Sequence, residues 1–140
     1  MTKQLSENIA NLQFLIVDDF ESIRVMLSES LKKLGIKKVM IATSGNQAFK
    51  TIQENISKEK QVQFVISDFN MKDGTGLDLI KAVRGQESLK KLPMLLLTSQ
   101  SELEVVLECI QAGVNDYLIK PWKDEDLSKK ITDICKSVYK

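Results

Sequence analysis

Five short apolar runs, each followed by a segment with helical spacing of apolar residues, constrain the fold more than any other feature of this sequence. The runs cover residues 14–17, 39–42, 62–67, 93–97 and 115–119. Unbroken apolar runs of this length are typical of strands buried on both faces, as parallel strands are. The alternation therefore predicts an α/β fold: a doubly wound five-stranded parallel sheet with five helices over its two faces.

Apolar stripes and end signals mark the five helices. They are expected over residues 20–34, after Ser44, over 76–84, from Ser101 to Gly113, and after Asp124. Ser44 has capping-box spacing with Gln47, and Ser101 with Glu104, while Asp124 is a candidate cap for the last helix. We interpret the apolar stripes as core, and they include Met26, Leu27, Leu31, Ile52, Ile110 and Ile131.

Composition and charge place the chain among ordinary soluble proteins. It has 140 residues, 43% hydrophobic content and a formal net charge of +1. We expect one domain over residues 13–140, preceded by a frayed or short helical extension over residues 1–12. The charge gives no case for nucleic-acid or membrane binding, and no apolar run approaches the ~20 residues of a membrane span. With no signal-peptide pattern, and with Cys109 and Cys135 suited to reduced thiols, we expect a cytoplasmic protein.

Histidine is absent from the chain. Its absence excludes Ser-His and Cys-His nucleophile pairs and zinc sites built on imidazole. The chain also cannot be a histidine phosphodonor. Any phosphoryl group handled here must therefore come from another molecule.

Polar side chains follow four of the five predicted strands. Asp18 and Asp19 follow the first strand, Asp68 the third, Thr98 the fourth and Lys120 the fifth. Because parallel strands end at one edge of the sheet, these side chains are expected to converge there. The plainer interpretation is that acidic residues after strands cap the next helices. Capping explains neither the lysine nor the position of the third carboxylate.

The chemistry of this set favours phosphoryl transfer. Three carboxylates in one place repel each other unless a cation is present, and oxygen ligands of this kind suit Mg²⁺. An aspartate can attack phosphorus to form an aspartyl phosphate while a metal screens the charge. Lys120 adds positive charge, and the Thr98 hydroxyl can donate to a phosphoryl oxygen.

At this point the sequence resembles the receiver domain of two-component response regulators, and most closely the single-domain chemotaxis regulators of the CheY type. The resemblance runs from about residue 13 to the end. It is strongest in the ordered set of segments 14–20, 64–71, 92–98 and 117–121. It implies a flavodoxin-like sheet with strand order 2-1-3-4-5.

The resemblance also implies a phosphoacceptor and a metal site. Asp68 is the residue phosphorylated by a histidine kinase. Asp19 and Asp68 ligate Mg²⁺ directly, Asn70 contributes its backbone carbonyl, and Asp18 acts mainly through water. Asn70 and Gln100 are the side chains that tune dephosphorylation, and a phosphatase is a further possible partner.

The remaining implied roles concern the switch. Lys120 and Thr98 bind the phosphoryl group, and the bond from Lys120 to the next residue is a cis peptide, as X-Pro bonds permit. Phosphorylation draws Thr98 inward, and Tyr117 then moves into the space. The surface of the fourth helix, fifth strand and fifth helix changes as a result.

Some positions depart from the family pattern. Lys72 stands where proline is usual, and Asp73 and Gly74 follow it, so we expect a more mobile turn. Trp122 replaces the usual phenylalanine. Gln100 stands where close chemotaxis relatives commonly have a carboxylate, which leaves the lifetime of the phosphorylated state open.

Three functions remain open at this stage. The leading one is a non-enzymatic, monomeric binding switch whose partner is a flagellar motor switch protein or another target. The alternative is a phosphoryl carrier or phosphate sink that exchanges phosphate with a histidine-containing protein. An aspartate-nucleophile phosphohydrolase is disfavoured, because a general acid is needed where this chain has Asn70.

Overall fold

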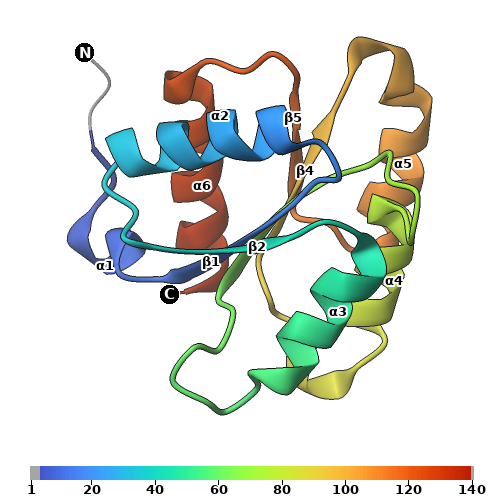
Figure 1. Cartoon of the computed structure of the whole chain (residues 1–140), viewed down its shortest axis with the longest axis horizontal. Helices are drawn as coiled ribbons and strands as arrows, with labels where there is room; N and C mark the ends of the chain where they lie inside the picture. Colours follow the sequence, from blue (N-terminus) through green and yellow to red (C-terminus); the bar gives the residue numbers. More distant parts are fainter. Residues whose placement is uncertain (1–3, 140) are drawn as a thin grey trace.

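A five-stranded parallel sheet forms the centre of the computed structural model, which describes residues 4–139. The strands are β1 (Gln13–Val17), β2 (Lys38–Ala42), β3 (Phe64–Asp68), β4 (Met94–Thr98) and β5 (Asp116–Ile119). They lie in the order β2-β1-β3-β4-β5, and every neighbouring pair is parallel (Figure 1). The predicted α/β class and strand order are both confirmed.

Six α-helices occur in the described part of the chain. They are α1 (Glu7–Ala10), α2 (Glu21–Lys33), α3 (Gly45–Glu54), α4 (Gly76–Arg84), α5 (Leu103–Ala112) and α6 (Asp124–Val138). Two short 3-10 turns, η1 (Glu87–Leu89) and η2 (Gln100–Glu102), flank β4. The five predicted helices correspond to α2–α6, and the additional helix lies in the predicted N-terminal extension.

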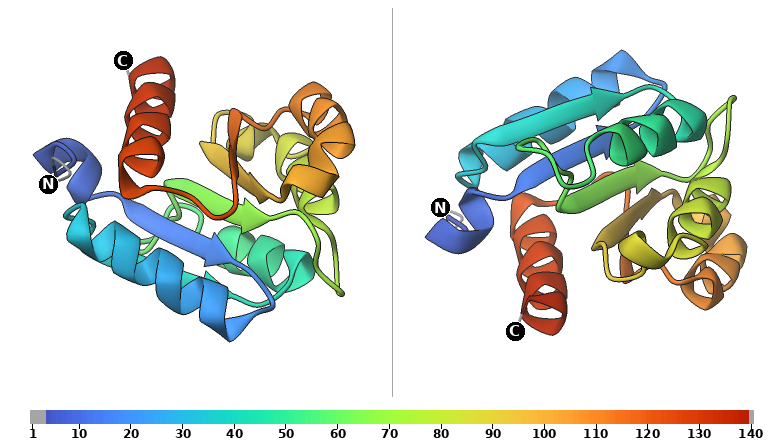
Figure 2. Two further views of the ribbon diagram at one scale, coloured as in Figure 1. Left: turned by 90° about the horizontal axis from the view of Figure 1, so that it is seen from above. Right: turned by 90° about the horizontal axis from the view of Figure 1, so that it is seen from below.

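The helices cover the sheet in two layers. Helices α2 and α6 lie on one face, and α3, α4 and α5 lie on the other (Figures 1 and 2). On the first face, Phe14 and Phe64 stack with ring centroids 4.8 Å apart and belong to the same buried cluster as Leu31 and Ile131. Side chains alternate between faces along each strand, so both core layers are built from the same apolar runs.

The N-terminal extension packs on the domain. The amide of Leu5 donates to the carbonyl of Leu34 at 2.8 Å, and Leu5 and Ile9 are buried in the cluster that holds Phe14. The Lys37 ammonium lies 3.3 Å from the Glu7 carboxylate. The short helix expected in this segment is present, and residues 1–3 lie outside the described part of the chain.

Two predicted helix starts are wrong. The capping box before α5 is formed by Ser99 and Glu102, two residues before the predicted Ser101 and Glu104. The reason is the backbone: Ser99 is extended, with φ −91° and ψ 164°, as an N-cap must be, whereas Ser101 already lies inside η2. Asp124 is the first residue of α6 rather than its cap.

The predicted cap of α3 is half confirmed. The Ser44 hydroxyl accepts a hydrogen bond from the Gln47 amide at 3.0 Å, as expected. The Gln47 side chain, however, accepts from the amide of Thr43, one residue before the cap, so the box is not reciprocal.

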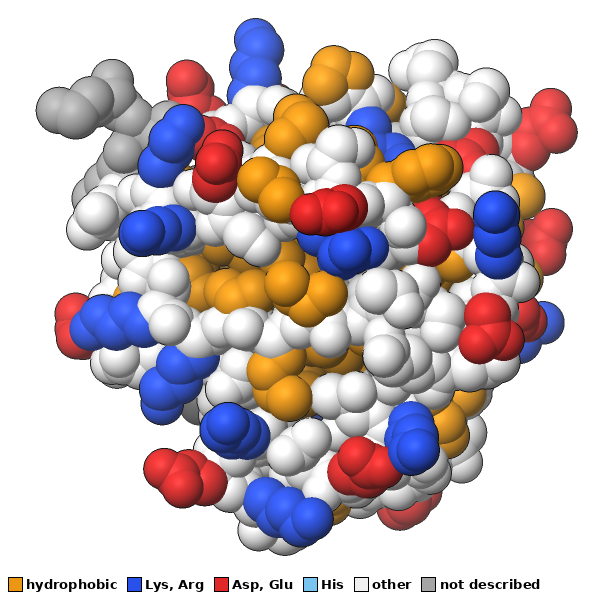
Figure 3. Space-filling model, viewed as in Figure 1, with side chains coloured by type: hydrophobic (Ala, Val, Ile, Leu, Met, Phe, Trp, Pro, Cys, Tyr) orange, Lys and Arg blue, Asp and Glu red, His pale blue; other side chains and the backbone are white. Residues whose placement is uncertain are grey.

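Two apolar residues assigned to the core are exposed. Met26 is 49% exposed and Ile110 is 46% exposed. Each is one position away from a buried residue, Leu27 and Cys109, and one helical step turns a side chain by about 100°. On the face that α2 and β2 present, apolar and charged side chains of both signs are interspersed (Figure 3).

Cys109 and Cys135 are buried as free thiols. Within residues 4–139, every helix is too short or too polar to cross a membrane.

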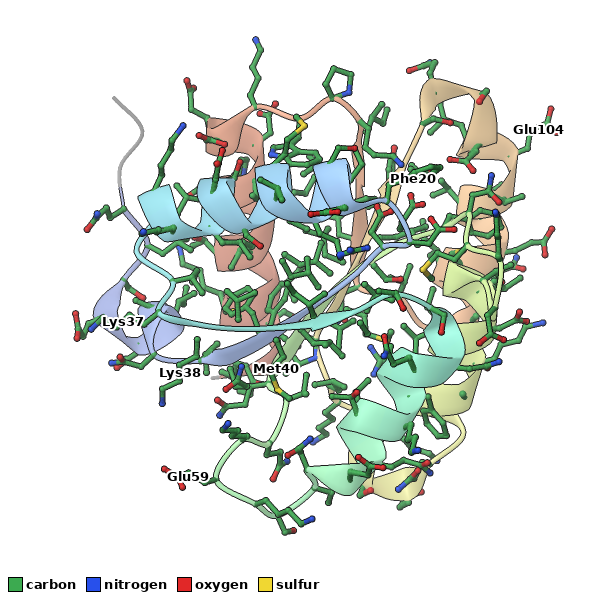
Figure 4. The ribbon with its side chains drawn as sticks, in the orientation of Figure 1. Phe20, Lys37, Lys38, Met40, Glu59 and Glu104 are labelled. Atoms are coloured by element: carbon green, nitrogen blue, oxygen red, sulfur yellow. The ribbon has the colours of Figure 1, made fainter. Side chains whose placement is uncertain are left out.

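Replacing Phe64 by alanine tests the stacked core. Phe64 is fully buried against Phe14, so we expect the free energy of unfolding to fall by about 3 to 5 kcal/mol. Urea unfolding measures this loss. Phe20, 61% exposed at the start of α2 (Figure 4), is the matched control, and Phe20→Ala should change stability by less than about 0.5 kcal/mol. Equal losses in the two variants would contradict the assignment of the core.

A carboxylate cluster at the carboxyl edge of the sheet

Three aspartates meet where β1 and β3 end. Asp18 and Asp19 follow β1, and Asp68 is the last residue of β3. These strands are neighbours with Val17 paired to Ser67, so their ends are level. One carboxylate oxygen from each aspartate lies within 4.8 Å of the others. The predicted convergence of these three residues is therefore present in the fold.

Lys120 places a cation beside this cluster. It follows β5, two strands away from β3, and its Nζ lies 2.7 Å from Asp68 Oδ1. The Lys120 amide donates to the Thr98 carbonyl at 2.8 Å, which fixes the residue beside β4, and the Lys120–Pro121 peptide is cis. A lysine side chain is long enough to reach past β4 to the third strand.

Asp18 is a buried carboxylate that is only partly satisfied. Its Oδ1 accepts a hydrogen bond from the Phe20 amide at 2.9 Å, whereas Oδ2 is buried and accepts none from the described residues. Burial, with added repulsion from Asp68, raises the pKa of Asp18 to about 6. The chain therefore pays an electrostatic cost to hold this carboxylate in its ionised form.

Asp68 is buried almost completely, and its ionised form is disfavoured in the same way as that of Asp18. Burial raises its pKa, and the ion pair with Lys120 opposes the increase without cancelling it. Asp19 Oδ1 is likewise buried and accepts no hydrogen bond within residues 4–139. Two buried carboxylate oxygens without a donor, beside a third carboxylate, are the oxygen ligands that a small divalent cation such as Mg²⁺ prefers. The residues present thus fit a metal ion.

Thr98 and Tyr117 lie next to the cluster along the sheet. Thr98 is fully buried at the end of β4, and its Oγ1 is 3.4 Å from the Ser99 carbonyl and 3.5 Å from Glu102 Oε1. Tyr117 is half-buried against the α3–α5 side of the core, with Lys130 Nζ 5.3 Å from its ring centroid. Thr98 lies on β4 and Tyr117 on β5, the fourth and fifth strands on which the sequence predicted them. Asn70 is exposed in the loop after β3, and Gln100 is exposed at the start of η2.

Two residues with no predicted role border the cluster. The Arg24 guanidinium, on the first turns of α2, donates to the Asp18 carbonyl at 2.9 Å. Glu102 accepts from the Ser99 amide at 2.9 Å, and its charge contributes to the raised pKa of Asp68 after the larger effect of burial. The spacing of Ser99 and Glu102 is the one sequence signal that could have indicated the second residue.

The loop after Asp68 is tied to the start of α3. The Asn46 side chain donates to Asp73 Oδ1 at 2.6 Å, and the Gly45 amide donates to the Gly74 carbonyl at 3.1 Å. Gly74 has φ +84°, which favours glycine, and a Cβ on Gly45 would lie 2.4 Å from the Gly74 carbonyl oxygen. The greater mobility expected of this turn stays a prediction, and these contacts act against it.

The order of strands and the residues at their ends define the class of protein. Residues 14–132 match the family model of the response regulator receiver domain. The chain belongs to the response regulator receiver family.

Its relatives include chemotaxis regulators. The chain is 36% identical to the chemotaxis protein CheY-3 of Vibrio cholerae over 124 residues, which cover 89% of this chain and 92% of CheY-3. It is 35% identical to the chemotaxis protein CheY of Pseudomonas aeruginosa over 127 residues, or 91% of this chain and 98% of that one. The structure of the chemotaxis response regulator CheY4 of Vibrio cholerae is similar, with a TM-score of 0.76, 34% identity, and coverage of 89% and 98%.

One similar fold carries a metal. The receiver domain of a sensor histidine kinase from Pseudomonas aeruginosa holds a magnesium ion in its active site cleft. It has a TM-score of 0.78 and 24% identity to this chain, covering 90% of this chain and 98% of that domain. At that identity the likeness establishes the shared fold.

Replacing Asp18 by asparagine should stabilise the metal-free protein. Near neutral pH the variant removes a buried charge, so we expect the free energy of unfolding to rise by roughly 1 to 3 kcal/mol. The folded pKa of about 6 lies above the ordinary 3.8. As the pH falls through this window, folded Asp18 takes up a proton first, and the cost of its charge is lost. The advantage of the variant should therefore shrink towards pH 4.

Urea unfolding in a chelating buffer at several pH values measures this difference. Glu59→Gln is the control, because Glu59 points into solvent from the loop between α3 and β3 (Figure 4). A stabilisation of the Asp18 variant that is independent of pH would contradict the electrostatic explanation.

Proposed function

We propose that this chain is a phosphorylation-controlled binding switch in which Asp68 accepts a phosphoryl group from a histidine kinase. The observation that carries the proposal is the position of the Asp68 carboxylate. It lies between two aspartates with unsatisfied oxygens and the Lys120 ammonium 2.7 Å away. A nucleophile flanked by a cation site and a fixed positive charge is what transfer of a phosphoryl group requires.

A magnesium ion completes the site in this proposal. Asp19 and Asp68 would bind it directly, Asn70 would contribute its backbone carbonyl, and Asp18 would act mainly through water. The ion supplies charge neutralisation between the attacking carboxylate and the phosphoryl oxygens. The unsatisfied oxygens of Asp18 and Asp19 support this ligand set, as does the magnesium ion in the related fold.

The chain's own residues perform the transfer by position. An Asp68 carboxylate oxygen attacks phosphorus as the bond from phosphorus to the donor's histidine nitrogen breaks, and that nitrogen keeps the electron pair. Lys120 exchanges its contact with Asp68 Oδ1 for one with a phosphoryl oxygen. Thr98 is fully buried one strand away, and its hydroxyl can donate to another phosphoryl oxygen.

In this proposal, water hydrolyses the acyl phosphate on Asp68 without a second catalytic acid. Asn70, two residues after the nucleophile, has an amide that does not titrate, so general acid catalysis is absent at that position. Asn70 and Gln100 are both exposed, two residues after Asp68 and Thr98 respectively, and we assign them the tuning of water attack on the acyl phosphate. This supports a signalling role over that of a phosphohydrolase.

The output surface lies on α5, β5 and α6. Thr98 is the last residue of β4, beside the phosphoryl site, and Tyr117 on the neighbouring strand β5 is half-buried against the core. On α5, Leu107 is 67% exposed and Ile110 is 46% exposed, so this face offers apolar area to a partner. Because relatives are chemotaxis regulators, we assign the target as a flagellar motor switch protein, bound by a cytoplasmic monomer.

Replacing Asp68 by asparagine tests the phosphoacceptor. The amide is not a nucleophile for phosphorus, so incorporation of labelled phosphate from acetyl phosphate with Mg²⁺ should fall by at least about 100-fold. Glu59→Gln, far from the sheet edge, should label at the rate of the parent chain. Labelling of Asp68→Asn with unchanged kinetics would rule out the proposed function.

Replacing Leu107 by glutamate tests the output surface. The side chain is exposed, so folding should be unaffected, while a charge in an apolar contact should weaken binding of the phosphorylated chain to the motor switch protein about tenfold or more. Calorimetry with beryllofluoride, a mimic of the acyl phosphate, measures this affinity.

Ile41→Glu is the matched control, because Ile41 is 53% exposed on β2 at the opposite edge of the sheet. Equal weakening of binding by both variants would contradict the assignment of this surface. Transfer of labelled phosphate from Asp68 to a histidine-containing protein, without binding to the motor protein, would favour the phosphoryl carrier instead.

A further inference from the structure

Glu102 places a carboxylate beside Thr98, one of the residues proposed to bind the phosphoryl group. It is the last residue of η2 and is partly buried. Its Oε1 accepts from the Ser99 amide at 2.9 Å and from the Ser99 hydroxyl at 3.0 Å. Thr98 Oγ1 lies 3.5 Å from the same oxygen. One carboxylate oxygen therefore lies near donors from the last residue of β4 and from the residue that follows it.

The Ser99 contacts fix this carboxylate in place. Both distances are those of ordinary hydrogen bonds, and they form part of the capping box that starts η2. The contact with Thr98 is weak by comparison, and the second acceptor of the Thr98 hydroxyl, the Ser99 carbonyl, is also distant at 3.4 Å. In this resting arrangement the hydroxyl points to weak acceptors beside Glu102, and a phosphoryl oxygen would compete for it strongly.

The charge of Glu102 lies near the place that the phosphoryl group would take. In the proposed site the Thr98 hydroxyl donates to a phosphoryl oxygen, and Glu102 Oε1 lies 3.5 Å from that hydroxyl. A phosphoryl group adds negative charge to Asp68. A carboxylate so close to the group disfavours the added charge, because like charges repel.

The geometry points to Glu102 as a residue that opposes phosphorylation of Asp68, because its carboxylate is held by Ser99 beside the Thr98 hydroxyl and repels the incoming phosphoryl group. This inference deepens the proposed function and rests on it. Glu102 thereby sets how much of the chain is phosphorylated at a given supply of phosphate.

Glutamine at this position separates charge from structure. Its amide oxygen can still accept from the Ser99 amide, so the capping box persists, while the negative charge is lost. We expect Glu102→Gln to take up phosphate from acetyl phosphate about two- to fivefold faster than the parent chain. Its affinity for beryllofluoride in saturating Mg²⁺ should rise by a similar factor. The thermal unfolding midpoint should not change, because no packed contact is removed.

Glu104→Gln is the matched control. Glu104 lies two residues further along, on α5, and points away from the sheet into solvent (Figure 4). The same charge is removed there, and we expect no change in labelling rate or affinity.

Two results would overturn the inference. Equal effects of Glu102→Gln and Glu104→Gln would show that only the net charge matters. A lower unfolding midpoint together with weaker beryllofluoride binding would show that Glu102 only caps η2. In both cases the parent chain still binds beryllofluoride, so the proposed function is not affected. Absence of beryllofluoride binding by the parent chain would instead remove the proposed function, and the inference with it.

Discussion

Repulsion among three carboxylates at one edge of a parallel sheet is the constraint on which the site depends. Adjacency of β1 and β3 brings Asp18, Asp19 and Asp68 together, and it follows from the strand order. The described residues answer that repulsion with one close ammonium, that of Lys120, and leave two buried oxygens without a donor. The resting site is therefore poised to gain from a divalent cation, because a bound ion relieves a cost already present in the fold.

The neighbours of Asp68 in the sheet suggest how a change of charge at the site would reach the surface in the proposed switch. Asp68 lies beside β4, and β4 ends in a buried threonine whose hydroxyl has acceptors at 3.4 and 3.5 Å among residues 4–139. In the proposed switch, a phosphoryl group would change the charge at Asp68 and offer Thr98 a stronger acceptor. β5 is the next strand, so a shift of Thr98 would act on Tyr117 and on the exposed face of α5. Small shifts at a packed site become alternative arrangements of its neighbours.

Much of this could be predicted from the sequence, because strand periodicity and strand-end chemistry are local. The alternation of apolar runs with helix-like segments indicated the parallel sheet, and the polar residues after the runs indicated the site. The strand order and the individual roles came from resemblance to a family. The capping box at Ser99 was missed because Ser101 has the same spacing to an acid, and only backbone geometry separates the two. The Arg24 contact depends on how α2 docks on the sheet, which no local pattern specifies. The position of Glu102, by contrast, follows from its local spacing to Ser99.

The fluorescence of Trp122 offers the most direct test of the central claim, that Asp68 is the centre of a Mg²⁺-dependent phosphoryl site. Trp122 is the only tryptophan in the chain, lies two residues after Lys120, and donates to the Ser30 hydroxyl at 3.1 Å. Titration with Mg²⁺ and then with beryllofluoride should change its emission in the parent chain, and beryllofluoride should have no effect in Asp68→Ala. Calorimetry on the same samples guards against a silent probe. Absence of metal binding by both methods, or an equal beryllofluoride response in Asp68→Ala, would contradict the account.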